Sequence, residues 1–155
     1  MFMKWKHPSR TKIYEALGAV ADGRVILNGN EAKVYSSSKN KYYNVTFDPS
    51  SSRIMCNDNS SYWKGELGYP SIAYLMLIGK LSIDIKVAEI LKDIPWKDIN
   101  QKFKNNFDEA LEYILKKKSV SEREILKQIV EKIDGEIRNM DLELLGEKVL
   151  PPSGY

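Results

Sequence analysis

The residues best suited to catalysis and metal binding, cysteine and histidine, each occur once in this 155-residue chain, as Cys56 and His7. A cysteine nucleophile needs a base within hydrogen-bond reach and a third group that orients the base. A structural zinc site takes about four ligands, mostly cysteine and histidine, and a single cysteine cannot form an intramolecular disulfide. We therefore predict no catalytic residues, no metal site and no cofactor, with Cys56 buried and His7 mobile near the terminus.

Acidic residues also fail to form a catalytic pair. Asp108 and Glu109, and likewise Glu122 and Glu124, lie where helices are predicted to begin. A carboxylate at a helix start interacts favourably with the helix dipole, which explains these residues without catalysis. The sequence therefore predicts a binding protein that is not an enzyme.

Basic and aromatic residues alternate in segment 4–12, which reads KWKHPSRTK, and a second basic group lies in the predicted sheet. Cations suit phosphate contacts, and an exposed aromatic ring can stack on a base. The candidate nucleic-acid-binding residues are Lys4, Trp5, Lys6, Arg10, Lys12, Lys39, Lys41 and Arg53. The alternative for both groups is a solvated surface that binds no ligand.

The charge distribution points the same way. Residues 1–80 carry 11 Lys and Arg against 6 Asp and Glu, whereas the rest of the chain is slightly acidic. Any affinity for polyanions is therefore expected in the N-terminal half. The longest apolar run, residues 72–78, is far shorter than the roughly 20 residues of a membrane span. We predict a cytoplasmic protein that does not enter the membrane.

Hydrophobic periodicity predicts the elements of the first half. Spacing of i, i+3, i+4, i+7 marks an amphipathic helix from Ser9 or Thr11 to Gly23, with Ile13, Ala16, Leu17 and Val20 on one face. Alternation then marks strands near residues 25–27, 32–34 and 43–47, with a hairpin turn at Asn28-Gly29 and a fourth strand at residues 53–56. Pro70 opens a buried helix that Gly79 ends.

Helical periodicity continues from Ser82, with a break at Asn105-Asn106 and a cap at Asp108. The last helix begins at a capping box in segment 121–124 and ends near Asn139, followed by a tail over residues 142–155. The predicted fold class is α+β: a small antiparallel β-meander of three to four strands with packed helices, then a C-terminal helical region. The expected division is residues 1–82 and 83–155.

Several segments in order resemble the SWIM domain: helix, Gly23-Arg24-Val25, the strands, Cys56-Asn57-Asp58, then Gly68-Tyr69-Pro70 opening a helix. This zinc module is associated with DNA or protein binding, and the suggested branch is that of the Shu-type recombination mediators. The resemblance places the ligand positions of the family at Ile54, Cys56, Ser71 and Ala73. Isoleucine and alanine cannot bind zinc, so the resemblance implies a degenerate, metal-free module.

Apolar residues assigned to the last helix are spaced 4, 3, 4, 3, 4, as in a heptad seam: Leu126, Val130, Ile133, Ile137, Met140 and Leu144. They can pack on helices of the same chain or form a partner interface, including a homodimer. We predict a non-catalytic adaptor that binds DNA or RNA weakly and non-specifically. The alternative is a protein-interaction or oligomerisation protein without affinity for nucleic acid.

Overall fold

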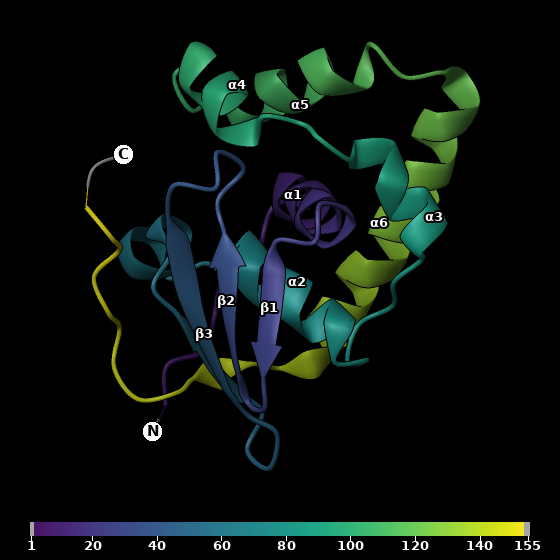
Figure 1. Cartoon of the computed structure of the whole chain (residues 1–155). Coiled ribbons are helices and arrows are strands. Elements are labelled where there is room, and N and C mark those ends of the chain that lie inside the picture. The colour runs from purple at the N-terminus through teal and green to yellow at the C-terminus, as the bar shows by residue number, and fades with distance from the viewer. Residues whose placement is uncertain (1, 154–155) are drawn as a thin grey trace.

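A five-stranded sheet forms one layer of the molecule in the computed structural model, which describes residues 2–153 (Figure 1). The strands are β1 (Val25–Asn28), β2 (Glu31–Tyr35), β3 (Tyr42–Asp48), β4 (Arg53–Cys56) and β5 (Glu143–Leu144). They lie in the order β1-β2-β3-β4-β5. The first four form the predicted antiparallel meander, and the α+β fold class is confirmed.

Strand alternation places one face of the meander in the core. Val34 pairs with Val25 and Tyr43, and all three are buried. The β1–β2 turn uses Gly29 at φ +61°, a left-handed conformation that glycine adopts without steric cost. Leu27 departs from the predicted pattern because it lies on an edge strand, where its side chain stays exposed.

The fifth strand corrects the prediction that residues 142–155 form only a tail. Glu143 and Leu144 pair in parallel with Arg53 and Ile54 of β4. The N-terminal segment is tied to the same edge, because the Trp5 backbone N–H donates to Leu142 O at 3.0 Å. Two-residue strands carry no periodicity, so local sequence cannot reveal them. Residues 154–155 of the predicted tail lie outside the described residues.

Helix α2 (Tyr69–Leu77) lies behind the sheet, and α1 (Arg10–Ala21) packs on α2 near the upper end of β1 (Figure 1). The predicted buried helix after Gly68 is confirmed, since α2 packs on strands β1 to β4 and is buried from Pro70 to Met76. The other helix differs from its prediction. Instead of being amphipathic, α1 is buried at every position from Thr11 to Val20, because α2 and four helical elements of the C-terminal half surround it.

The C-terminal half is helical, as predicted. It contains α3 (Ile85–Ala88), the 3₁₀ turn η2 (Glu89–Leu91), α4 (Trp96–Lys102), α5 (Phe107–Leu115) and α6 (Val120–Met140). The side chain of Asn106, rather than Asp108, caps α5. The capping box of α6 uses Ser119 and Glu122, so the helix begins earlier than predicted.

One hydrophobic cluster joins both halves of the chain. It includes Leu17 and Val45 from the N-terminal half and Leu126 and Ile133 from α6. The division at residue 82 stays a prediction from sequence. Within residues 2–153, no helix is both long and apolar enough to cross a membrane.

Candidate functional site

The basic N-terminal segment is held against α6 and β4. Lys4 Nζ lies 2.9 Å from Asp141 Oδ1, and the Arg10 guanidinium donates to Glu131 Oε2 at 2.9 Å. Trp5 is half-buried, and its indole N–H donates to the carbonyl of Ile54 at 2.9 Å. Lys6 is exposed, and its backbone bridges to Glu66. Carboxylates therefore pair with Lys4 and Arg10, two of the cations predicted to contact phosphates.

The remaining candidates do not extend this segment into a basic face. Arg53 lies over the Phe2 ring at 3.3 Å, with its Nε 3.8 Å from Glu143 Oε1. Lys41 donates to the Ser153 carbonyl, while Lys39 is exposed in the loop between β2 and β3. Lys12 is buried, contrary to the prediction of a surface cation.

His7 does not have the mobility predicted for it. Its Nε2 lies 2.7 Å from Asp134 Oδ1, and Arg138 contacts the same carboxylate at 3.2 Å. The other candidate for chemistry behaves as predicted, because Cys56 is buried and free. Burial and the nearby Asp58 carboxylate raise the pKa of its thiol, so the reactive thiolate is disfavoured.

The heptad-spaced residues of α6 form part of the core of the chain. Leu126, Val130, Ile133 and Ile137 are buried, while Met140 and Leu144 are half-buried. The four buried residues therefore pack within the chain, which was one of the two predicted roles, and they are not accessible to a partner. Leu144 belongs to β5 and not to the helix.

A cavity of about 340 Å³ lies beside the N-terminal half of α1. The loop after β2 reaches toward α4 (Figure 1), where the Lys97 backbone N–H donates to Ser37 Oγ at 2.9 Å and closes one side. The wall is polar and aromatic. Its side chains come from Lys12, Glu15, Arg24, Ser36, Ser37, Tyr43, Asp58, Asn59, Ser60, Tyr69, Trp96, Lys97, Asn100, Gln101, Asn105 and Phe107.

Four ionisable side chains of this wall are almost fully buried: Lys12, Glu15, Arg24 and Asp58, with 3 to 8% of their surface exposed. Lys12 and Glu15 are three residues apart on α1, which places them on neighbouring turns of one face. Arg24 pairs with Asp22, its Nε lying 3.0 Å from Oδ2. Charged side chains are rarely buried this deeply unless they are paired, so their concentration marks the cavity as specialised.

The Lys12 ammonium lacks a carboxylate partner. No Asp or Glu oxygen within residues 2–153 lies within 4.0 Å of it, and its contact is with the Phe107 ring, 4.1 Å from Nζ to the ring centroid. A cation over an aromatic face gains about 2 kcal/mol when desolvated, but its three N–H groups still need acceptors.

Two buried polar atoms of the wall lack hydrogen-bond partners in the described part of the chain. Asn100 donates to Glu15 Oε1 at 3.3 Å, but the other end of its amide, Oδ1, has no donor. The Trp96 indole N–H also has no acceptor in the described part of the chain. Each unsatisfied buried polar atom costs about 1–3 kcal/mol, so folding alone gives no reason to keep them.

Both acids of the cavity are shifted toward their neutral forms. Burial raises the pKa of Glu15, although the nearby Lys12 charge and the Asn100 hydrogen bond act in the opposite direction. Burial also raises the pKa of Asp58, and hydrogen bonds from Ser61 and Cys56 partly oppose that shift. Such shifts are common at functional sites, since removal from water penalises the charged form.

Asp58 is held in place by close packing. Its carboxylate accepts hydrogen bonds from the Ser61 hydroxyl and, at 3.4 Å, from the Ser61 backbone N–H. Gly68 lies directly against it, because a methyl group at Gly68 would come within 2.0 Å of Asp58 Oδ2. The close approach of Gly68 therefore limits the positions that the Asp58 carboxylate can take in the wall of the cavity.

Sequence patterns missed this site because its residues are far apart along the chain. Of its buried polar residues, only Lys12 was a candidate, and for a different role; Glu15, Arg24, Asp58, Trp96 and Asn100 were not. Local sequence carried no signal for it, because the burial of Lys12 and Glu15 on α1 is visible only in the structure.

The four positions aligned with SWIM ligands are all buried. Ile54 and Cys56 lie on β4, Ser71 and Ala73 lie on α2, and these two elements are in contact. Within residues 2–153, no group of three or more His, Cys, Asp or Glu side chains could hold a metal ion. The resemblance itself remains a prediction.

Comparison with known families covers nearly the whole chain. The family described as Uncharacterised conserved protein UCP014422 matches residues 5–143. The chain belongs to this family. The match includes every residue that lines the cavity, from Lys12 to Phe107. No curated protein and no solved structure is significantly similar to the chain.

Proposed function

We propose that this protein binds a small polar organic molecule in the cavity between α1, α4 and the loop after β2. The supporting observation is the burial of Lys12, Glu15, Arg24 and Asp58 around one cavity. Removing charges from water costs several kcal/mol for each ion, and apolar residues of similar volume would usually stabilise the fold more. A binding role explains why the polar residues are kept.

The cavity also has the size of a ligand site. Its volume of about 340 Å³ lies in the usual range of roughly 300–1,000 Å³ for small-molecule pockets. Tyr69, Trp96 and Phe107 supply apolar surface, while Glu15 and Asn100 supply hydrogen-bonding groups. Polar and charged side chains outnumber the aromatic ones on the wall, so several hydrogen bonds can fix the orientation of a polar ligand.

The test is a titration of the ¹⁵N-labelled protein with a library of anionic, cationic and neutral polar metabolites. We expect at least one compound to shift amide signals of cavity residues in a saturable way. Asn100→Leu, which removes both hydrogen-bonding ends of the amide, should weaken that binding. Asn139→Leu is the matched control, because Asn139 is exposed on α6.

Two results would contradict the proposal. The first is that no compound of the library shifts the amide signals of the cavity residues. The other is binding that Asn100→Leu leaves unchanged, with the variant folded by circular dichroism, since the ligand would then lie elsewhere.

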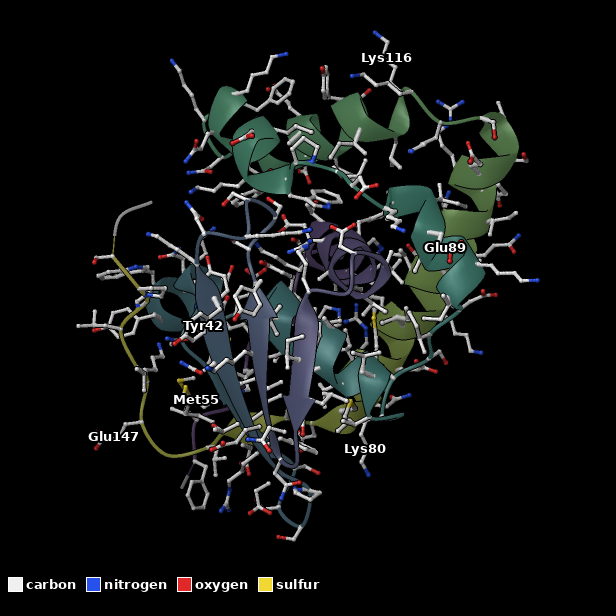
Figure 2. All side chains as sticks on the ribbon, viewed as in Figure 1. Tyr42, Met55, Lys80, Glu89, Lys116 and Glu147 are labelled. Carbon is white, nitrogen blue, oxygen red and sulfur yellow. The ribbon has the colours of Figure 1, made fainter. Side chains whose placement is uncertain are left out.

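A second candidate function is weak nucleic-acid binding on the sheet face that the helices leave uncovered. Tyr35 and Tyr42 lie side by side there with ring centroids 5.5 Å apart, and Lys33 Nζ lies 4.8 Å from the centre of the Tyr42 ring. Figure 2 labels Tyr42, which is 41% exposed. Aromatic rings on an open face can stack on unpaired bases.

Fluorescence anisotropy with single-stranded and duplex DNA, at low and physiological salt, tests this candidate. Weak binding should fall with salt, and Tyr42→Ser should reduce it more on single strands. Tyr113→Ser on α5 is the control. Absence of binding at low salt would remove nucleic acid as a partner and favour the interaction-protein alternative.

A further inference from the structure

We infer that the ligand of the cavity is a small organic anion, a carboxylate or a phosphate ester, whose charged oxygens contact Lys12 Nζ. This inference rests on the proposed function, because it names the chemical class that the same cavity selects. The observation behind it is that the buried Lys12 ammonium has no carboxylate within 4.0 Å in residues 2–153.

Lys12 is placed to recognise charge and not to stabilise the fold. Only 8% of its surface is exposed, yet its ammonium has no carboxylate within 4.0 Å in residues 2–153 and lies over the Phe107 ring. By contrast, buried Arg24 is matched by Asp22 and donates to the Tyr35 carbonyl at 2.7 Å. Lys12, which has no such carboxylate partner, lines the cavity, where an anionic oxygen can accept hydrogen bonds from its N–H groups.

The acids of the cavity do not replace such an anion. Glu15 and Asp58 both interact electrostatically with Lys12, and burial raises the pKa of each. Neither brings a carboxylate oxygen within 4.0 Å of Lys12 Nζ, so neither forms an ion pair with it. Lys97 also lines the cavity. An incoming anion therefore meets a Lys12 ammonium that no carboxylate of residues 2–153 approaches within 4.0 Å.

The part of the wall next to Lys12 suits an uncharged polar group on the same ligand. Glu15 and Asn100 are hydrogen-bonded to each other at 3.3 Å, and the free end of the Asn100 amide can accept from a hydroxyl or amine. Lys12 and Glu15 lie on adjacent turns of α1, so the two ligand groups need only a few bonds between them. A hydroxy acid or a sugar phosphate has this arrangement.

The experiment compares three probes that share one carbon skeleton: glycerate, glycerol 3-phosphate and glycerol. Each is titrated into the ¹⁵N-labelled wild-type protein to about 20 mM at constant ionic strength, since compounds of this size reach about millimolar affinity. We expect saturable shifts of Lys12, Glu15 and Asn100 amides with at least one anion and none with glycerol. The stronger anion distinguishes a carboxylate from a phosphate ligand.

Lys12→Met keeps the length of the side chain and removes its charge. It should weaken anion binding about tenfold or more, the usual loss for a charge-assisted hydrogen bond. Lys39→Met, at an exposed loop position, should leave the affinity within about twofold. The wild-type comparison of anions with glycerol decides the inference even if Lys12→Met does not fold.

The outcomes separate this inference from the proposed function. Glycerol binding as tightly as the anions, or unchanged affinity in folded Lys12→Met, would overturn the anion inference and leave the cavity as a ligand site. The same holds if the metabolite library yields only neutral or cationic ligands that depend on Asn100. No binding by any compound would overturn both.

Discussion

Gly68→Ala tests how tightly Asp58 is fixed in the wall of the cavity. Gly68 has φ −87° and ψ 164°, an extended conformation open to any residue, so alanine brings no backbone strain. Its methyl group, however, would lie 2.0 Å from Asp58 Oδ2 and 2.5 Å from Cγ. Either the carboxylate or the start of α2 must move by about 1.4 Å to lengthen the 2.0 Å approach to an ordinary contact of 3.4 Å.

The expected cost has two parts. Overpacking of a tight interior costs about 1–3 kcal/mol. Moving the carboxylate also weakens its hydrogen bonds with Ser61, and a hydrogen bond to a charged group is worth about 1.5–3 kcal/mol. We therefore expect Gly68→Ala to lower the free energy of unfolding by about 3–5 kcal/mol.

Urea unfolding followed by circular dichroism measures this loss. Gly135→Ala on α6 is the matched control, because a methyl group there meets nothing within 4 Å; it should gain up to about 1 kcal/mol from helix propensity. In an Asp58→Ala background the space is vacated, so Gly68→Ala should then cost less than about 1 kcal/mol. A loss below about 1 kcal/mol in the wild-type background would refute the packing argument.

Three further predictions concern the core, the metal and the buried acid. Leu75→Ala, in fully buried α2, should cost about 2–5 kcal/mol in denaturant titration, whereas Leu77→Ala, 36% exposed at the helix end, should cost less than about 1 kcal/mol. Elemental analysis should find no stoichiometric zinc, and chelators should leave the melting temperature unchanged, because two of the four SWIM positions are Ile54 and Ala73. Burial raises the pKa of Glu15 above its ordinary value of 4.5. The folded state therefore binds the Glu15 proton more tightly than the unfolded state does. The resulting stabilisation is complete below about pH 4.5 and is lost as the pH rises through the raised pKa. The stability of Glu15→Gln relative to wild type should therefore increase with pH, and a difference constant between about pH 4 and 8 would contradict this.

The sequence determined those parts of the protein that depend on neighbouring residues. Alternating apolar residues and the Asn28-Gly29 turn predicted the meander, and β1 to β4 formed where expected. Pro70 and the apolar run after it predicted the buried helix α2. Periodicity fixes which face of a strand or helix is apolar, and turn residues fix where it ends, so these features need no knowledge of distant partners.

The tertiary structure alone decided what surrounds each polar side chain. The same periodicity that predicted α1 could not show that five other elements would bury Lys12 and Glu15, and the arm from Lys4 to Arg10 met carboxylates more than a hundred residues away. The cavity joins Lys12 and Asp58 to Asn100 because α4 contacts the loop following β2. The sequence determines which side chains can carry a charge or form a hydrogen bond. The pKa of Glu15 and the absence of a carboxylate near Lys12 depend instead on burial and distance, which only the folded chain defines.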